Sequence, residues 1–426
     1  MLVIQTAAQT VNVTSGAGVV RWTASTRRPR PHALDSLRPP SRRYVPRIVY
    51  ISNGNVPSKW AHTFHVVKMT EALSRNGHSV TLLTGRGIFR DAPRRTDLES
   101  WYGVERNFRV WRLPAVRRMK SPSIGGAKTA IYRRCAAAAV RLIRPHLVIT
   151  RDKDIADTLV RRGFDTLVEL HTPVAEASIE TLVAMQRLPA FGGLVTVTEE
   201  LRSQYVRAGM DPGRILVLPD GVDLRRFEGG QGDRLERLSD RPTVVYTGHL
   251  YEMKGVDTLR DAARLTPRCD FRFVGGWPDD VERMRAESVG LDNVRWDGFV
   301  GNSELAAIQK AADILALPNS GRFAHARETS PLKLFEYLAA GRPIIATDVP
   351  AFRSVLRHGR NAHLVPPDDA VAMAAGIDRL LTDRVYAESL AEAARRDARG
   401  YSWEKRAKSL VAFASRSDSE SQPTWA

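Results

Sequence analysis

Residues 327–343 carry the sequence features that point most directly to chemistry. Ser330 is a good helix N-cap, Pro331 suits the first helical position, and Gly341 suits the residue just past a helix end. This pattern predicts one short helix that begins at Ser330 and has Leu332 in its first turn. The start of such a helix offers free backbone N–H groups and a partial positive charge, so it is suited to bind phosphate.

Two glutamates frame this predicted helix. Glu328 precedes it, and Glu336 lies about one and a half turns into it. Apolar residues flank Glu336 on both sides, so we expect its carboxylate to sit beside buried surface and to need a partner there. A carboxylate accepts two hydrogen bonds from neighbouring hydroxyl groups such as those of a ribose. Phosphate at the helix start and sugar hydroxyls at the carboxylates together predict a nucleotide-sugar site.

The same stretch resembles a known family. Glu328 and Glu336 are separated by seven residues, and within the run from Ser330 to Asp348 they resemble the Glu-x7-Glu motif of retaining GT-B glycosyltransferases of family 4. The resemblance implies transfer of a hexose, with retention, from a nucleoside diphosphate sugar to a hydroxyl of a carbohydrate or lipid-linked acceptor. It also implies that Glu336 holds the ribose and that Glu328 holds the transferred sugar.

A loop after a predicted strand, Tyr246–Gly255, resembles the family's Gly-Arg-x(n)-Lys-Gly phosphate loop. Gly248 and Lys254 match this motif, whereas His249 stands where the arginine is usual. A neutral His cannot clamp a diphosphate through two parallel hydrogen bonds, so a donor contact and a plain loop role both remain open for His249. Lys254 and the helix start would stabilise the charge of the departing diphosphate. The resemblance implies front-face attack, with the leaving phosphate accepting the acceptor's proton, and implies no metal or other cofactor.

Two further positions match the family in the first half of the chain. His171 follows a predicted strand and resembles the histidine that contacts the donor hexose. Gly54, in the predicted turn Asn53–Asn55, stands where relatives carry a glycine pair, so it is a candidate diphosphate contact. Lys59, Trp60, His62 and His65 follow this turn. A helix that begins among them could hold the acceptor.

Three other segments have more structural interpretations. Leu218–Phe227 resembles the family's hinge before the domain boundary, with a mainly architectural role. Val294–Val300 resembles the loop whose backbone reads the nucleobase edge, although a plain strand-to-turn segment is an equal alternative. Asp152 and Asp154 have the form of the Asp-x-Asp metal motif of GT-A enzymes, but no GT-A pattern accompanies them, so we interpret them as a helix start.

The elements that must position these residues alternate between strand and helix patterns along the chain. Residues 45–227 predict an acceptor-side domain, and residues 228–400 predict a nucleotide-sugar domain after a polar, glycine-rich break. The fold class is therefore α/β: two doubly wound, Rossmann-like domains face each other across a cleft, as in GT-B enzymes. Residues 401–426 predict a helix that crosses back to the first domain, followed by a loose tail.

Composition bounds the remaining functions. The chain has 426 residues, 43% of them hydrophobic, which is enough for two sizeable cores. Its two cysteines predict no disulfide framework, and its apolar runs are too short to span a bilayer. Residues 1–44 are basic and predict a disordered extension, with a mis-assigned start codon or a transit peptide as alternatives. We expect a cytoplasmic protein.

The net charge of +17 is concentrated in one segment. Residues 106–151 contain twelve Lys or Arg residues and no Asp or Glu, with apolar residues in between. This composition predicts peripheral contact with an anionic membrane such as the inner membrane face, while a nucleic-acid surface and a solvated basic face are the alternatives. We expect no nucleic-acid partner. Two rival functions remain open as well: a GT-B-fold epimerase or phosphorylase, and a non-catalytic nucleotide-sugar-binding or membrane scaffold.

Overall fold

A computed structural model describes residues 46–58, 60–86, 98–114, 122–228, 240–323 and 328–419, together with β1 (Gln5–Thr6) and β2 (Gln9–Thr10), which pair antiparallel. Residues 1–44 and 45–426 form two separate compact units. Most of the predicted N-terminal extension, the predicted break at residues 229–239 and the predicted tail at residues 420–426 lie outside the described residues.

The first half of the large unit is built on a parallel sheet with the strand order β5-β4-β3-β6-β7-β8-β9. Its strands are β3 (Arg47–Asn55), β4 (Ser79–Arg86), β5 (Arg109–Pro114), β6 (Leu147–Thr150), β7 (Thr166–Leu170), β8 (Phe191–Thr196) and β9 (Ile215–Val217). Strands β6, β7 and β8 are buried on both faces, as expected for a parallel sheet covered by helices. The predicted turn at Asn53–Asn55 is wrong, because β3 continues through these residues with an irregular register against β4.

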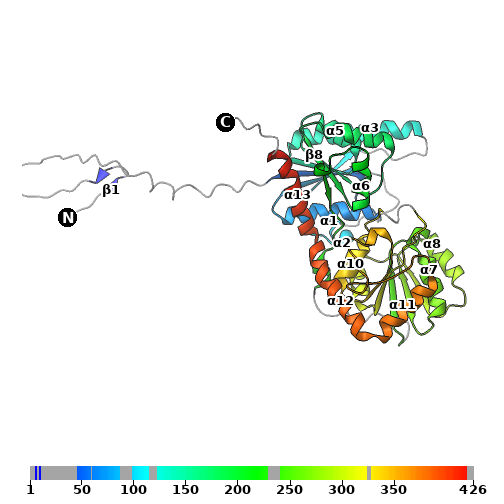
Figure 1. The fold of residues 1–426 in the computed structure, drawn as a ribbon. Helices are drawn as coiled ribbons and strands as arrows, with labels where there is room; N and C mark the ends of the chain where they lie inside the picture. The colour runs from blue at the N-terminus through cyan, green and yellow to red at the C-terminus, as the bar shows by residue number, and fades with distance from the viewer. Residues whose placement is uncertain are drawn as a thin grey trace, which may run out of the picture. The chain divides into compact units, whose positions relative to one another are not determined.

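Helices cover both faces of this first sheet (Figure 1). They are α1 (Ala61–Arg75), α2 (Leu98–Tyr102), α3 (Pro122–Ile143), α4 (Lys153–Val160), α5 (Glu176–Met185) and α6 (Glu199–Arg207). The prediction of a helix start at Asp152 and Asp154 is confirmed, because the Asp152 carboxylate accepts hydrogen bonds from the backbone N–H groups of Asp154 and Ile155 at the start of α4. Arg133 forms an ion pair with Asp154.

The second half of the large unit repeats the plan with the strand order β12-β11-β10-β13-β14-β15, and every pair in it is parallel. The strands are β10 (Thr243–Thr247), β11 (Asp270–Val274), β12 (Val294–Gly298), β13 (Ile314–Leu317), β14 (Ile344–Thr347) and β15 (His363–Val365). The helices are α7 (Val256–Leu265), α8 (Pro278–Glu287), α9 (Asn302–Ala311), α10 (Leu332–Ala340), α11 (Ala370–Thr382) and α12 (Arg384–Ala398). Two buried clusters, one on each face, form the core around this sheet.

The strand order changes direction between β3 and β6 in the first sheet and between β10 and β13 in the second. At such a switch point the connections leave on opposite faces and open a crevice at the carboxyl ends of the strands, where α/β proteins bind ligands. The loop after β10 starts at one of these points and contains Gly248 and His249. Two tandem, doubly wound domains were predicted from the sequence, and the structure confirms them.

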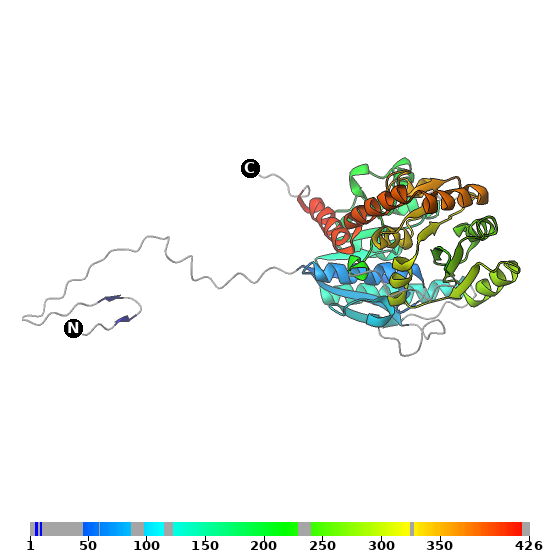
Figure 2. The same ribbon diagram turned by 90° about the horizontal axis from the view of Figure 1, so that it is seen from below.

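The C-terminal helix α13 (Trp403–Ser419) crosses back to the first domain, as predicted, and Figure 2 shows it following α12. Trp403, Ala407 and Leu410 are buried in the same cluster as residues of α1 and β3. The Asn76 side chain after α1 donates a hydrogen bond to the Glu404 carbonyl at 2.9 Å. These contacts make α13 part of the first domain's core, although the sequence places it after the second domain.

The basic segment 106–151 includes β5, α3 and β6. Tyr132, Ala136 and Val140 of α3 are buried against the sheet, whereas Ile131 and Leu142 are exposed. Part of the apolar content of the segment therefore belongs to the core, and the proposed membrane contact stays a prediction. Among the residues that the structure describes, no helix is both long enough and apolar enough to cross a membrane.

Candidate active site in the interdomain cleft

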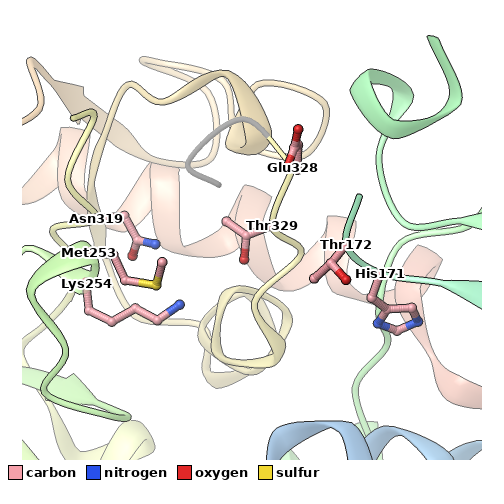
Figure 3. Close-up of a pocket in the computed structure, with 7 residues that line it drawn as sticks. All are labelled: His171, Thr172, Met253, Lys254, Asn319, Glu328 and Thr329. Carbon is pink, nitrogen blue, oxygen red and sulfur yellow. The ribbon is translucent and has the colours of Figure 1, made fainter. Parts of the chain in front are cut away.

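Two neighbouring cavities lie between the two Rossmann-like domains. The larger, of about 390 Å³, and the smaller, of about 210 Å³, share His171, Lys254 and Thr329 in their walls. Figure 3 shows the smaller one, with Met253, Lys254 and Asn319 on one side, His171 and Thr172 on the other, and Thr329 between them. The predicted site residues in the wall of the larger cavity are Gly248, His249, Lys254, Ser330, Pro331, Leu332, Glu336 and His171.

Helix α10 begins at Leu332, one residue after Pro331, the predicted first helical position. Pro331 occupies the N-cap position, and Ser330 does not cap the helix, so that part of the prediction is wrong. The Ser330 hydroxyl instead accepts a hydrogen bond from the backbone N–H of Asp220, at 3.1 Å, and so links the two domains at the cavity wall. The predicted helix end is confirmed, because Gly341 has a φ of 63° in the left-handed region that favours glycine.

Glu336 has the buried partners that the sequence predicted it would need. Its two carboxylate oxygens accept hydrogen bonds from Arg226 Nη1 at 3.2 Å and from Gln309 Nε2 at 3.0 Å. Arg226 belongs to the short helix η4 (Leu224–Phe227) in the predicted hinge segment. Each carboxylate oxygen has a second lone pair, so these bonds orient the group without exhausting its capacity to accept further ones.

Glu328 lies in the wall of the smaller cavity rather than the larger one. Its Oε1 accepts a hydrogen bond from Gln204 Nε2 at 2.5 Å, and Gln204 belongs to α6 of the first domain. Glu328 therefore connects the two domains, and it shares the wall of the smaller cavity with His171. Gly54 lies near the carboxyl end of β3, and its predicted contact with the diphosphate stays a prediction.

The loop after β10 holds His249 in an aromatic stack. The imidazole lies 4.9 Å from the Tyr251 ring and 5.6 Å from the Trp277 ring, nearly parallel to both. Burial lowers the pKa of His249, and the nearby ammonium groups of Lys254 and Lys333 lower it further. The imidazole is thus held neutral, which argues against a cationic clamp on diphosphate from this position.

Two lysines line the larger cavity from the second domain, and the sequence interpretation singled out only Lys254. Lys333, the second residue of α10, is 9% exposed, and its Nζ has no hydrogen-bond partner among the described residues. No hydrogen bond or ion pair to Lys254 is found in that part of the chain either. Burial lowers the pKa of both lysines, that of Lys333 well below its usual value. We call Lys254 and Lys333 the lysine pair.

The first domain contributes a buried group that we call the His171 cluster, whose members are His65, Glu169, His171, Asp220 and Arg406. The Glu169 carboxylate lies at its centre, with Oε1 at 2.9 Å from His65 Nε2 and 3.0 Å from His171 Nε2. Arg406 of α13 approaches the same oxygen at 2.6 Å. Although burial alone would raise it, the Arg406 guanidinium holds the pKa of Glu169 well below its usual range.

His171 is neutral in this arrangement. Burial, followed by the charges of Arg151 and His65, lowers the pKa of His171 to about 3. Because Nε2 faces a carboxylate, it carries the ring proton and leaves Nδ1 as an acceptor. His65, His171 and Asp220 each offer one side-chain nitrogen or oxygen, and these three atoms lie within 4.8 Å of one another. They are already hydrogen bonded within the cluster, His65 Nδ1 to Asp220 at 2.6 Å, so their chemistry fits a positioning network for the His171 ring better than a metal centre.

Sequence reasoning missed Lys333, Glu169, Asp220 and Arg406. A signal for Lys333 existed, because it lies three residues before Glu336 in the same motif while the loop lacks its usual arginine. Glu169 is followed two residues later by His171, but its bond to Arg406 spans 237 residues of sequence. No local pattern announces a contact over such a separation.

Two family models match this chain, one in each of its Rossmann-like domains. Residues 63–226 match the family model described as "Glycosyltransferase Family 4", and residues 241–383 match the model described as "Glycosyl transferases group 1". The chain is similar to sucrose-phosphate synthase from Thermosynechococcus elongatus in fold, with a TM-score of 0.69 and 22% identity over 88% of this chain and 100% of that one.

Two curated relatives match shorter stretches. The phosphatidyl-myo-inositol mannosyltransferase of Mycobacterium leprae is 34% identical over 165 residues, 38% of this chain and 43% of that protein. A D-inositol 3-phosphate glycosyltransferase of Geodermatophilus obscurus is 31% identical over 238 residues, 51% of each. The matches thus span about half the length of these relatives. Taken with the two family models, the tandem domains and the cleft between them, they show that the chain belongs to glycosyltransferase family 4 and has the GT-B fold.

Proposed function

We propose that this protein transfers a hexosyl group from a nucleoside diphosphate sugar to an acceptor hydroxyl. The observation that carries the proposal is the larger cavity, in which cationic side chains and the start of α10 from one domain face His171 from the other. A diphosphate fits the cationic wall, because buried ammonium groups need a counter-ion. A sugar attached to it would extend toward His171 and Glu328.

The proposed reaction proceeds with retention. The bond from the sugar's anomeric carbon to the diphosphate breaks, a bond to the acceptor oxygen forms on the same face, and the acceptor's proton passes to the leaving phosphate. Lys254 and the start of α10 stabilise the charge that builds on the diphosphate. Glu336 accepts hydrogen bonds from the ribose, Glu328 and His171 orient the transferred sugar, and no metal takes part.

The acceptor is expected to reach the cavity from the side of α1. His62 and His65 of this helix lie in the cavity wall, and the exposed Trp60 ring lies 5.8 Å from Trp277 of the second domain. The relatives named above act on phosphatidyl-myo-inositol and on inositol 3-phosphate according to their names. Inositol-containing acceptors are therefore the first to assay. We propose a cytoplasmic location with peripheral contact to an anionic membrane through residues 106–151.

The test combines a donor panel with an acceptor panel. Purified protein is incubated with UDP-, GDP- and ADP-hexoses, with and without inositol-containing acceptors, and both the released nucleotide and the product are measured. Acceptor-dependent release, and an anomeric NMR signal with the donor's configuration, are expected. Conversion of the nucleotide sugar without an acceptor would favour an epimerase instead, and binding without any turnover would favour a non-catalytic scaffold.

A further inference from the structure

The lysine pair has a feature that the family motif does not explain. The motif supplies one arginine and one lysine for the diphosphate, and this chain has His249 in place of the arginine. Resting on the proposed function, we propose that Lys333 of α10 provides the second cation for the diphosphate and so replaces the missing arginine of the loop.

The position of Lys333 places its ammonium in the cavity wall next to this loop. Its Nζ lies 3.7 Å from the centre of the Tyr246 ring, at the end of β10. A Cβ atom added to Gly248 would lie 3.2 Å from the same Nζ, so the ammonium lies beside the backbone that immediately precedes His249. The ammonium of Lys333 thus lies beside the loop that carries the arginine in the family motif.

The environment of Lys333 is that of a cation without its counter-ion. Within the described part of the chain its Nζ has no hydrogen-bond partner, although it is buried. The charged groups that interact with it most are Lys254, which repels it, and Glu336, which attracts it. Glu336 is already hydrogen bonded to Arg226 and Gln309. Buried charges are normally paired, so two neighbouring ammonium groups in one cavity wall are the surroundings that an anion would complete.

A role in packing alone explains these observations less well. The ring of Tyr246 attracts the ammonium, and such an attraction compensates only part of the cost of burying a charge. A packing role would also be served by an uncharged side chain of similar length. The two explanations differ in what they predict for ligand binding, because only the diphosphate role makes affinity depend on the charge of residue 333.

The experiment measures diphosphate binding by isothermal titration calorimetry. UDP, GDP and ADP are titrated into the wild-type protein, and the best of them is titrated into Lys333→Met and into the control Lys408→Met, which removes an exposed lysine from α13. We expect Lys333→Met to bind at least about tenfold more weakly and Lys408→Met to bind as the wild type does. Adding His249→Arg to Lys333→Met should restore most of the lost affinity, since it returns a cation to the loop.

Each other outcome has a defined meaning. Circular dichroism first confirms that the variants are folded, and Lys333→Gln is measured beside Lys333→Met so that the result does not depend on one substitution. Wild-type affinity in both variants would overturn the inference while leaving the proposed function standing. Weaker binding without recovery by His249→Arg would overturn the replacement of the loop arginine. If the wild type binds none of the three diphosphates, the proposed function itself fails.

Discussion

The two walls of the cleft differ in whether their buried charged side chains are paired with one another. In the His171 cluster of the first domain, the carboxylates of Glu169 and Asp220 lie within hydrogen-bonding distance of His65, and Arg406 pairs with Glu169. In the second domain, the lysine pair has no such partner within the described residues. The charged groups of the first wall are paired with one another, whereas we propose that the lysine pair gains a counter-ion only when an anion enters the cavity. The difference indicates which wall is built for stability and which for binding.

The largest expected effect comes from removing a charge from the His171 cluster in the first wall. Arg406→Met leaves the buried Glu169 without its cation and should lower the free energy of unfolding by about 3–5 kcal/mol. Urea denaturation measures the change, and Lys408→Met on the exposed side of the same helix is the matched control. Equal unfolding midpoints for the wild type and Arg406→Met would show that the cluster does not stabilise the first domain.

A substitution of Glu336 in the second wall should weaken the interaction with the ligand. Glu336→Ala is expected to reduce donor binding or transition-state stabilisation by about 2–3 kcal/mol, as for a charged hydrogen bond left unmade. The ratio of kcat/KM between variant and wild type measures this, with the exposed Glu392→Ala as a control. Kinetics like those of the wild type would remove the Glu336 carboxylate from the mechanism.

The two walls should also differ in how a lost charge affects the stability of the protein without ligand. Lys333→Met removes a buried amino group whose charged form is disfavoured by burial, and it should raise the free energy of unfolding by on the order of 1 kcal/mol without ligand, while it weakens diphosphate binding. Denaturation with and without the diphosphate tests both parts. If Lys333→Met is less stable than the wild type in the absence of ligand, Lys333 is not a buried group that lacks a counter-ion.

The smallest expected effect is a pH dependence of binding. The pKa of each lysine of the pair is lowered in the empty site, mainly by burial, and a bound diphosphate favours the charged form. Binding should therefore take up protons, and affinity should fall as the pH rises through the lowered pKa values. Calorimetry in buffers of different ionisation enthalpy measures the uptake, which should be smaller in Lys333→Met. His171, with a pKa of about 3, stays neutral over this range and contributes nothing.

Much of the fold was accessible from the sequence because local signals agree with the tertiary structure. The predicted alternation of strand and helix patterns is observed in both domains, since each apolar run ends at a break in its pattern. Helix α3 was not predicted, because the positive charges spread through that segment obscure the apolar face that the helix buries. The turn predicted at Asn53–Asn55 was wrong because these residues extend β3, which pairs with β4 again at Asn55 after a shift in register.

The site could be predicted as far as single motifs reach. Helix α10, Glu336 within it, Glu328 before it and Lys254 were each predicted from a short local motif. These residues line the two cavities. The partners of these residues were not found. Gln204 binds Glu328 across 124 residues, and the Ser330 hydroxyl turns to Asp220 instead of capping its own helix. Such choices depend on which surfaces the fold brings together, and spacing in one segment does not contain that information.

The crossing helix α13 has a consequence for how the chain is made. The first domain places Trp403, Ala407 and Leu410 in its own core, and the bond from Asn76 to Glu404 joins residues 328 positions apart. The ribosome must therefore complete the whole second domain before the first can bury its apolar surface fully. In many chains the domains fold one after another during synthesis. Here the core of the first domain cannot be completed until α13 has been synthesised.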